Sequence, residues 1–177
     1  MAMTLITTNT SSNVASSSFT SSIDSTYKLY IFKFYDVNPA TDGAAFRFNG
    51  SIDGGSNYNV TKTTTYFAAS NNEADTSSEL SYETSYDLAQ STAYKQLIRD
   101  IGNGGDESGA GTLWLFNPSN TVYVKHFYSV TNDYYYGNYS MNAYTGGFFN
   151  TTDNIDAIDF KMSSGNMDAV IKMYGVG

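Results

Sequence analysis

Residues 27–37, with the sequence YKLYIFKFYDV, decide the class of fold. Successive side chains of a β-strand point to opposite faces of the sheet, so residues at positions i and i+2 share a face. In this stretch both faces are apolar, with Leu29 and Ile31 on one and Tyr30, Phe32 and Phe34 on the other. Such a pattern is typical of a strand buried on both sides. The stretch therefore predicts a central strand between two layers.

The same period of two recurs along most of the chain and predicts an all-β fold. Turn-forming sequences, such as Asn117–Asn120 and Ser164–Asn166, separate the predicted strands. The predicted strands cover residues 27–37, 46–49, 61–67, 112–116, 121–130, 137–145, 155–163 and 168–176. Together with strands in the N-terminal region, they indicate a single antiparallel β-sandwich of the jelly-roll type with about eight to ten strands. We expect this domain to span residues 24–177.

Residues 91–101 allow two interpretations. Tyr94, Leu97, Ile98 and Ile101 recur at nearly helical spacing, and a glycine follows them. The segment is either one short helix or a strand that leads into a loop. We therefore expect at most one short helix in the chain.

Composition excludes several classes of function. The 177 residues carry 9 Lys+Arg against 17 Asp+Glu, a net charge of −8, so no basic surface is available to neutralise nucleic-acid phosphates. The absence of cysteine and the single histidine exclude disulfides, thiolate zinc sites and centres with several histidines. No apolar run approaches the roughly 18 residues of a membrane span. We expect no cofactor, no metal, no nucleic-acid partner and no membrane contact.

Residues with catalytic side chains do not form a recognisable catalytic pattern. His126 lies among apolar neighbours on a predicted strand and is expected to be a packing residue. The carboxylates fall in polar segments where solvated charge is expected, including the pairs Glu79/Glu83 and Asp106/Glu107. The loop Asp53–Asn57 offers oxygen ligands of the kind that calcium prefers, although Asp-Gly is first of all a turn signal. We therefore predict that the protein is not an enzyme.

Residues 1–23 contain no charged side chain. One interpretation is an edge strand at Thr4–Thr8, followed by a loop and a second strand near Phe19. The other is an arm that pairs with a neighbouring chain by strand addition, since charges normally block such pairing. In the second interpretation Leu5, Ile6 and Phe19 contact the partner. Residues 1–6 also lack the basic region and apolar core of a signal peptide, so we expect synthesis in a cytoplasm.

Tyr134, Tyr135 and Tyr136 form the best candidate for a binding surface within the domain. Tyrosine combines a large apolar area with a hydroxyl group, which suits both sugar stacking and protein interfaces. Three consecutive residues cannot all point to one side of a strand. At least one of the three side chains is therefore expected to point outward or to lie in a loop.

Several phrases along nearly the whole chain resemble small structural proteins of marine tailed bacteriophages, cyanophages among them. The phrases are Asp36–Gly43 (DVNPATDG), Asp53–Thr61 (DGGSNYNVT), Gly111–Ser119 (GTLWLFNPS), Tyr123–Phe127 (YVKHF) and Ile155–Gly175 (IDAIDFKMSSGNMDAVIKMYG). Similar proteins coat the virion as head decoration, cement or fibre-like components. The resemblance does not identify any active-site residues in this sequence.

The resemblance implies a non-enzymatic virion protein, made in the host bacterial cytoplasm and located on the capsid surface. A capsid decoration or cement protein would bind the major capsid protein or other virion proteins through extensive contacts. By analogy with jelly rolls displayed on capsids, we expect a homotrimer. The alternative is a carbohydrate-binding module of a tail fibre that recognises host surface glycans through residues 134–136 and the polar loops.

Overall fold

The computed structural model describes residues 2–177, and these residues form an antiparallel β structure. Its strands are β1 (Met3–Val14), β2 (Ser16–Phe19), β3 (Leu29–Pro39), β4 (Ala44–Ser51), β5 (Lys62–Asn72), β6 (Ser78–Tyr82), β7 (Leu88–Ser91), β8 (Lys95–Ile101), β9 (Gly109–Phe116), β10 (Lys125–Tyr135), β11 (Tyr139–Phe149), β12 (Ala157–Met162) and β13 (Met167–Val176). Among residues 2–177, the one helical element is a 3-10 turn, η1 (Thr84–Tyr86). The prediction of an all-β fold with at most one short helix is confirmed. Within the described residues, no helix is long and apolar enough to cross a membrane.

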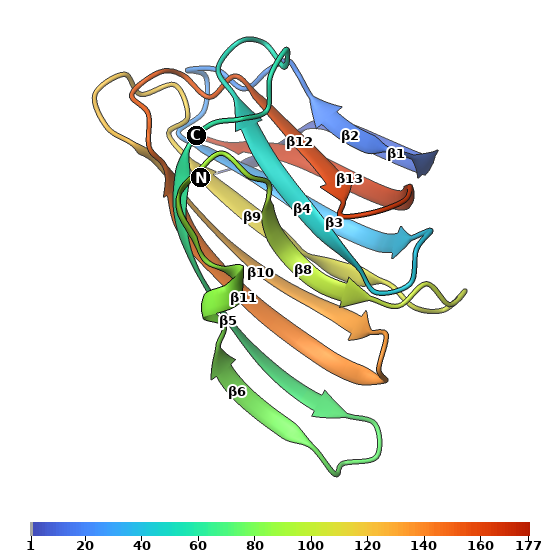
Figure 1. The fold of residues 1–177 in the computed structure, drawn as a ribbon. Helices are drawn as coiled ribbons and strands as arrows, with labels where there is room; N and C mark the ends of the chain where they lie inside the picture. Colours follow the sequence, from blue (N-terminus) through green and yellow to red (C-terminus); the bar gives the residue numbers. More distant parts are fainter. Residues whose placement is uncertain (1) are drawn as a thin grey trace.

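Two groups of four strands pack face to face in the upper part of the molecule (Figure 1). One group has the order β1-β13-β3-β9 and the other has the order β2-β12-β4-β8. The chain alternates between them, from β1 to β2, β3 to β4, β8 to β9 and β12 to β13, an interleaving that jelly rolls also have. The two groups are not separate sheets, however. A bridge between Tyr135 of β10 and Ile101 of β8 joins them into one 13-stranded sheet that nearly closes into a barrel.

Five further strands extend the first group beyond the second, and we call them the wing. They follow β9 in the order β10-β11-β5, and both β6 and β7 pair with β5. Strands β10, β11, β5 and β6 form the lower half of the molecule (Figure 1). The strands β5, β6 and β7 are inserted between β4 and β8, while β10 and β11 are inserted between β9 and β12. The predicted count of eight to ten strands was too low, because β6, β7 and β8 add to the strands that the sequence predicted.

The helical interpretation of residues 91–101 is wrong, because most of the segment is strand β8. Leu97 and Ile98, which point to opposite faces of β8, are both fully buried. A helix would bury one side only, whereas β8, at the edge of the second group where it meets the wing, buries residues on both faces. Burial on both faces produced apolar positions that imitated helical spacing.

The core between the two groups is built from phenylalanine. Phe160 of β12 lies at its centre, with its ring centroid 5.2 Å from that of Phe34 and 5.6 Å from that of Phe46. Its ring also contacts those of Phe19, Phe32 and Phe48. Phe32 and Phe34 come from β3, so one face of the quoted stretch 27–37 lies in the core. On the other face Lys33 is partly exposed and Tyr35 is exposed, so the prediction of a strand between two layers is wrong for that face.

The N-terminal segment is part of the same sheet. Strand β1 pairs with β13 from Met3 to Val14, and β2 pairs with β12. Phe19 and Ile23 belong to the same buried cluster as the phenylalanines of the centre. Residues 2–23 and 24–177 therefore share one sheet and one core, with β1 as an edge strand.

Candidate functional site

The three N-terminal candidates differ in their exposure. Leu5 is 50% exposed on β1, while Ile6 is partly buried against the core. Phe19 is only 3% exposed, and its ring centroid lies 5.3 Å from that of Phe32. The prediction that Phe19 contacts a partner is wrong for this fold, because pairing of β2 with β12 turns its side chain into the core.

At the end of β10 the Tyr134 side chain separates from those of Tyr135 and Tyr136, whose ring centroids lie 4.7 Å apart. The Tyr134 hydroxyl lies 3.0 Å from Glu73 Oε1 on the β5–β6 turn. Tyr135 points to the other side, where the guanidinium of Arg99 lies over its ring. Tyr136 is exposed in the turn to β11. The structure therefore does not bring the three side chains together into one surface, although Tyr136 does point outward.

A row of apolar side chains crosses the outer face of the first group, away from the second group. Leu5, Tyr174, Ile31, Trp114 and Tyr128 are successive partners across β1, β13, β3, β9 and β10. Directly opposed residues in antiparallel strands point to the same face. The row thus joins Leu5 at the sheet edge to Tyr128 in the wing.

Aromatic rings stack on one another along this outer face. The Trp114 and Tyr128 ring centroids lie 4.6 Å apart, and those of Phe67 and Tyr144 lie 4.8 Å apart. Tyr128 and Phe67 remain 41% and 40% exposed. Phe116 packs against the other side of this stack, 5.6 Å from Tyr128. We define the aromatic face as Leu5, Phe67, Trp114, Phe116, Tyr128, Tyr144 and Tyr174.

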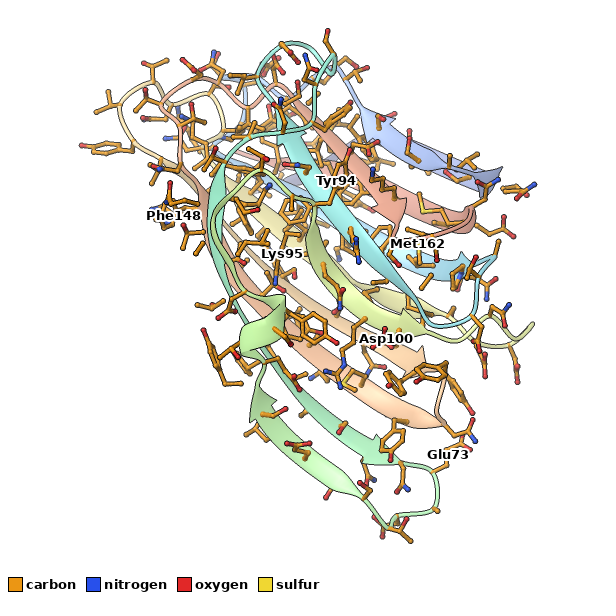
Figure 2. All side chains as sticks on the ribbon, viewed as in Figure 1. Glu73, Tyr94, Lys95, Asp100, Phe148 and Met162 are labelled. Atoms are coloured by element: carbon orange, nitrogen blue, oxygen red, sulfur yellow. The ribbon has the colours of Figure 1, made fainter. Side chains whose placement is uncertain are left out.

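An apolar hollow continues the aromatic face beyond Phe116. It has a volume of about 500 Å³ and is lined by Phe116, Val122, Tyr123 and His126, among others. Tyr123 is 70% exposed. The expected packing role of His126 is wrong, because Lys125 and Phe127 point inward and turn His126 to the outside. Its ring lies 6.1 Å from Phe148, which points away from β8 (Figure 2). An apolar hollow of this size suits a large side chain of a partner.

The inner face of the wing combines a small apolar cluster, Tyr66, Ala68, Met141 and Ala143, with several buried polar groups. Ser129, Thr145 and Tyr66 are successive partners across β10, β11 and β5, and all three are buried. The hydroxyls of these residues, the Arg99 Nε and both carboxyl oxygens of Asp133 have no hydrogen-bond partner in the protein. Burial raises the pKa of Asp133 to about 8 and raises that of Tyr66 as well.

Three fully buried lysines hold loops in place by donating hydrogen bonds to backbone carbonyls. The Lys95 ammonium, which lies between β8 and the wing (Figure 2), donates to a backbone carbonyl in the η1 turn. Lys62 and Lys125 likewise donate to backbone carbonyls of loops. Burial lowers the pKa of Lys62 to about 7 and that of Lys95 to about 8. Because each of the three amino groups donates to backbone carbonyls of loops, we assign these lysines a structural role. The acceptors are Tyr86 for Lys95, Ala93 for Lys62, and Tyr123 and Thr151 for Lys125.

Replacement of Asp133 by asparagine should change the pH dependence of stability. Because the pKa of Asp133 is about 8 in the native state and near 3.8 when unfolded, the native state holds more protons between these values. Native stability therefore falls as pH rises from about 4 to 8. Asp133→Asn removes this loss of stability at high pH, because asparagine does not ionise. The buried amide lacks hydrogen-bond partners, and the cost of burying it offsets part of the gain in stability.

We expect Asp133→Asn to exceed the parent chain in stability by about 2 kcal/mol at pH 9 and to show no gain at pH 4. Urea denaturation at both pH values measures the difference. Asp36→Asn removes an exposed carboxylate and should show no such pH dependence. A difference between Asp133→Asn and the parent that stays constant with pH would contradict the assignment.

The remaining candidate carboxylates form ion pairs or hydrogen bonds with other groups of the protein. Glu83 forms an ion pair with Arg99 at 3.1 Å, and Glu107 accepts a hydrogen bond from the backbone of Gly104. Asp53 accepts hydrogen bonds from Ser51 and Asn57 and thereby closes its own loop. Hydrogen bonds to its carboxylate lower the pKa of Asp53 to about 2, and the bond from the Asn57 side chain has the largest effect. Among residues 2–177, no group of three or more His, Asp or Glu side chains is placed to hold a metal ion.

Comparison with protein-family models, with curated proteins and with solved structures found no match to this chain.

Proposed function

We propose that the chain is a non-enzymatic structural protein of a phage virion, a capsid decoration or cement protein that attaches through its aromatic face. The observation that carries the proposal is the continuous outer row from Leu5 to Tyr128 with the stacked rings beside it. The virion as the location rests on the resemblance of the sequence phrases to phage structural proteins.

The aromatic face has the composition of an interface. Contiguous exposed apolar patches are uncommon on soluble monomers and mark binding surfaces. Tryptophan and tyrosine dominate the energetically important positions of protein interfaces. The single tryptophan of the chain, Trp114, lies on this face against Tyr128. The energy of attachment would therefore come from burial of Trp114, Tyr128 and their neighbours, summed over many copies on the shell.

The partner in this proposal is the major capsid protein or another virion protein, with homotrimers as the form displayed on the capsid. The net charge of −8 keeps the domain away from the like-charged phosphates of DNA. The rigid core around Phe160 suits an exposed domain that must resist proteolysis. In this account the N-terminal strand contributes Leu5 to the attachment surface.

The proposal is tested by purifying virions of a phage that encodes the chain and quantifying the chain by mass spectrometry. We expect many copies per virion, which antibody labelling in the electron microscope should place on the head. Absence of the chain from purified virions would overturn the proposal. Labelling confined to the tail would overturn the assignment to the capsid.

A further inference from the structure

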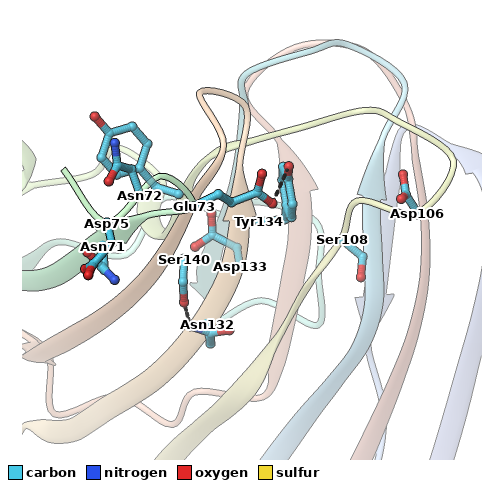
Figure 3. Close-up of a pocket in the computed structure, with 11 residues that line it drawn as sticks. Asn71, Asn72, Glu73, Asp75, Asp106, Ser108, Asn132, Asp133, Tyr134 and Ser140 are labelled. Carbon is cyan, nitrogen blue, oxygen red and sulfur yellow. Dashed lines mark hydrogen bonds between the residues drawn. The ribbon is translucent and has the colours of Figure 1, made fainter. Parts of the chain in front are cut away.

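A polar hollow lies at the far end of the wing, at the opposite end of β10 from His126. It has a volume of about 500 Å³, which falls in the range of roughly 300–1,000 Å³ typical of ligand pockets. Its walls are the end of β5 and the turn after it, with Asn71, Asn72, Glu73 and Asp75, and the loop before β9, with Asp106 and Ser108 (Figure 3). Residues at the end of the β10–β11 hairpin lie between these walls.

The lining consists of hydrogen-bonding groups and tyrosine rings. It includes four carboxyl groups, those of Glu73, Asp75, Asp106 and Asp133, and it contains no lysine or arginine. Asp133 lies between Glu73 and Ser140 in Figure 3. It is 3% exposed, and neither of its carboxyl oxygens has a hydrogen-bond partner in the protein. Asp133 is therefore a buried polar group beside the hollow, and contact with a ligand falls to the more exposed side chains of the lining.

Neighbouring contacts hold other groups of the lining in place. The Tyr134 hydroxyl bonds to Glu73 across the hollow, which joins the wall formed by the β5–β6 turn to the hairpin. The Asn132 amide nitrogen donates to the Met141 carbonyl at 2.9 Å, so its amide oxygen remains free as an acceptor. The hollow is thus rich in fixed acceptors, and its shape does not depend on a ligand.

We propose that this hollow binds a neutral hexopyranose unit of a glycan through the sugar hydroxyls. Sugar hydroxyls donate to carboxylate and amide oxygens, while tyrosine rings such as Tyr134 and Tyr139 offer apolar surface to the sugar. The carboxylates of Glu73, Asp75 and Asp106, without a basic partner in the lining, repel anionic sugars such as uronic or sialic acids. A divalent cation is a poorer fit, since the described residues contain no group of side chains placed to hold one.

Titration of the full-length, ¹⁵N-labelled chain tests this proposal by NMR. The neutral probes are the methyl glycosides of glucose, galactose and N-acetylglucosamine, and the anionic probe is methyl glucuronide. Concentrations up to about 50 mM detect millimolar dissociation constants. We expect at least one neutral glycoside to shift the signals of lining residues such as Asn71 and Asn132, and the glucuronide to bind more weakly.

Two variants assign the binding to the hollow. Asn71→Ala removes an amide of the wall, and Tyr134→Phe removes the hydroxyl that holds Glu73. Each should weaken binding about fivefold or more, the effect of one lost hydrogen bond. Asp36→Asn, an exposed change outside the hollow, should leave the affinity unchanged. Because the titration uses the isolated chain, its result is independent of the proposed attachment to a virion.

Four results would overturn the proposal: no response to any neutral glycoside, shifts confined to residues outside the hollow, equal binding of methyl glucuronide, or unchanged affinity in both lining variants. A response of the lining residues to calcium chloride alone would identify a cation site and overturn the sugar assignment as well.

Discussion

Replacement of Phe160 by alanine should lower the free energy of unfolding by about 3–5 kcal/mol. Phe160 is fully buried, and its ring contacts five other phenylalanine rings from β2, β3 and β4. Truncation removes the transfer free energy of the ring and leaves a cavity that rigid neighbouring rings cannot fill. Urea denaturation of the parent chain and of Phe160→Ala, followed by tryptophan fluorescence, measures the loss.

Phe67→Ala is the matched control for this prediction. Phe67 is also a strand phenylalanine, but it lies on the outer face and stacks with only Tyr144. Its removal should cost about 1 kcal/mol, the size of one exposed aromatic pair. Equal losses in the two variants would mean that the stability of the chain does not depend on the core between the two groups of strands.

The double variant Trp114→Ser, Tyr128→Ser should lower the affinity for the virion shell at least about 100-fold. Central tryptophan and tyrosine side chains of interfaces contribute about 2–4 kcal/mol each, and 1.4 kcal/mol corresponds to a factor of ten. The two rings stack on each other on the outer face, so their loss leaves the core intact. Binding of the purified variant to shells stripped of the parent protein, quantified by sedimentation, measures the change.

Ile52→Ser is the control for the attachment surface. Ile52 is an exposed apolar residue that follows β4, outside the aromatic face. Its replacement removes a similar apolar group and should leave shell binding unchanged. The far-UV circular dichroism of both variants should match that of the parent chain. Wild-type affinity of a folded Trp114→Ser, Tyr128→Ser chain would exclude the aromatic face as the attachment surface.

The sequence predicted the fold class because local patterns carry it. Tyr30, Phe32 and Phe34 of β3 are apolar at alternate positions and buried as expected, whereas the other side of the strand is only partly covered and Tyr35 is exposed. The interleaved strand order could be predicted only by analogy with known jelly rolls, because pairing between distant strands leaves no local pattern in the sequence. The short strands β6 and β7 were missed because Ser78–Tyr82 and Leu88–Ser91 are mostly polar at the edge of the wing.

The aromatic face could not be predicted from the strand patterns. Residues 112–116 are apolar on both faces, with Leu113 and Leu115 on one and Trp114 and Phe116 on the other. Leu113 and Leu115 are fully buried, whereas Trp114 stacks with the exposed Tyr128. Which side is covered depends on where the second group of strands lies, and that is a property of the complete fold. For the same reason Phe19 was expected on the surface and is found in the core.

Electron cryo-microscopy of decorated virions tests the central claim most directly, because it shows which face of the domain contacts the shell. Our account predicts that Trp114, Tyr128 and Leu5 lie in the contact with the capsid or with a neighbouring virion protein. A reconstruction in which the domain is attached by another surface, with the aromatic face open to solvent, would contradict it.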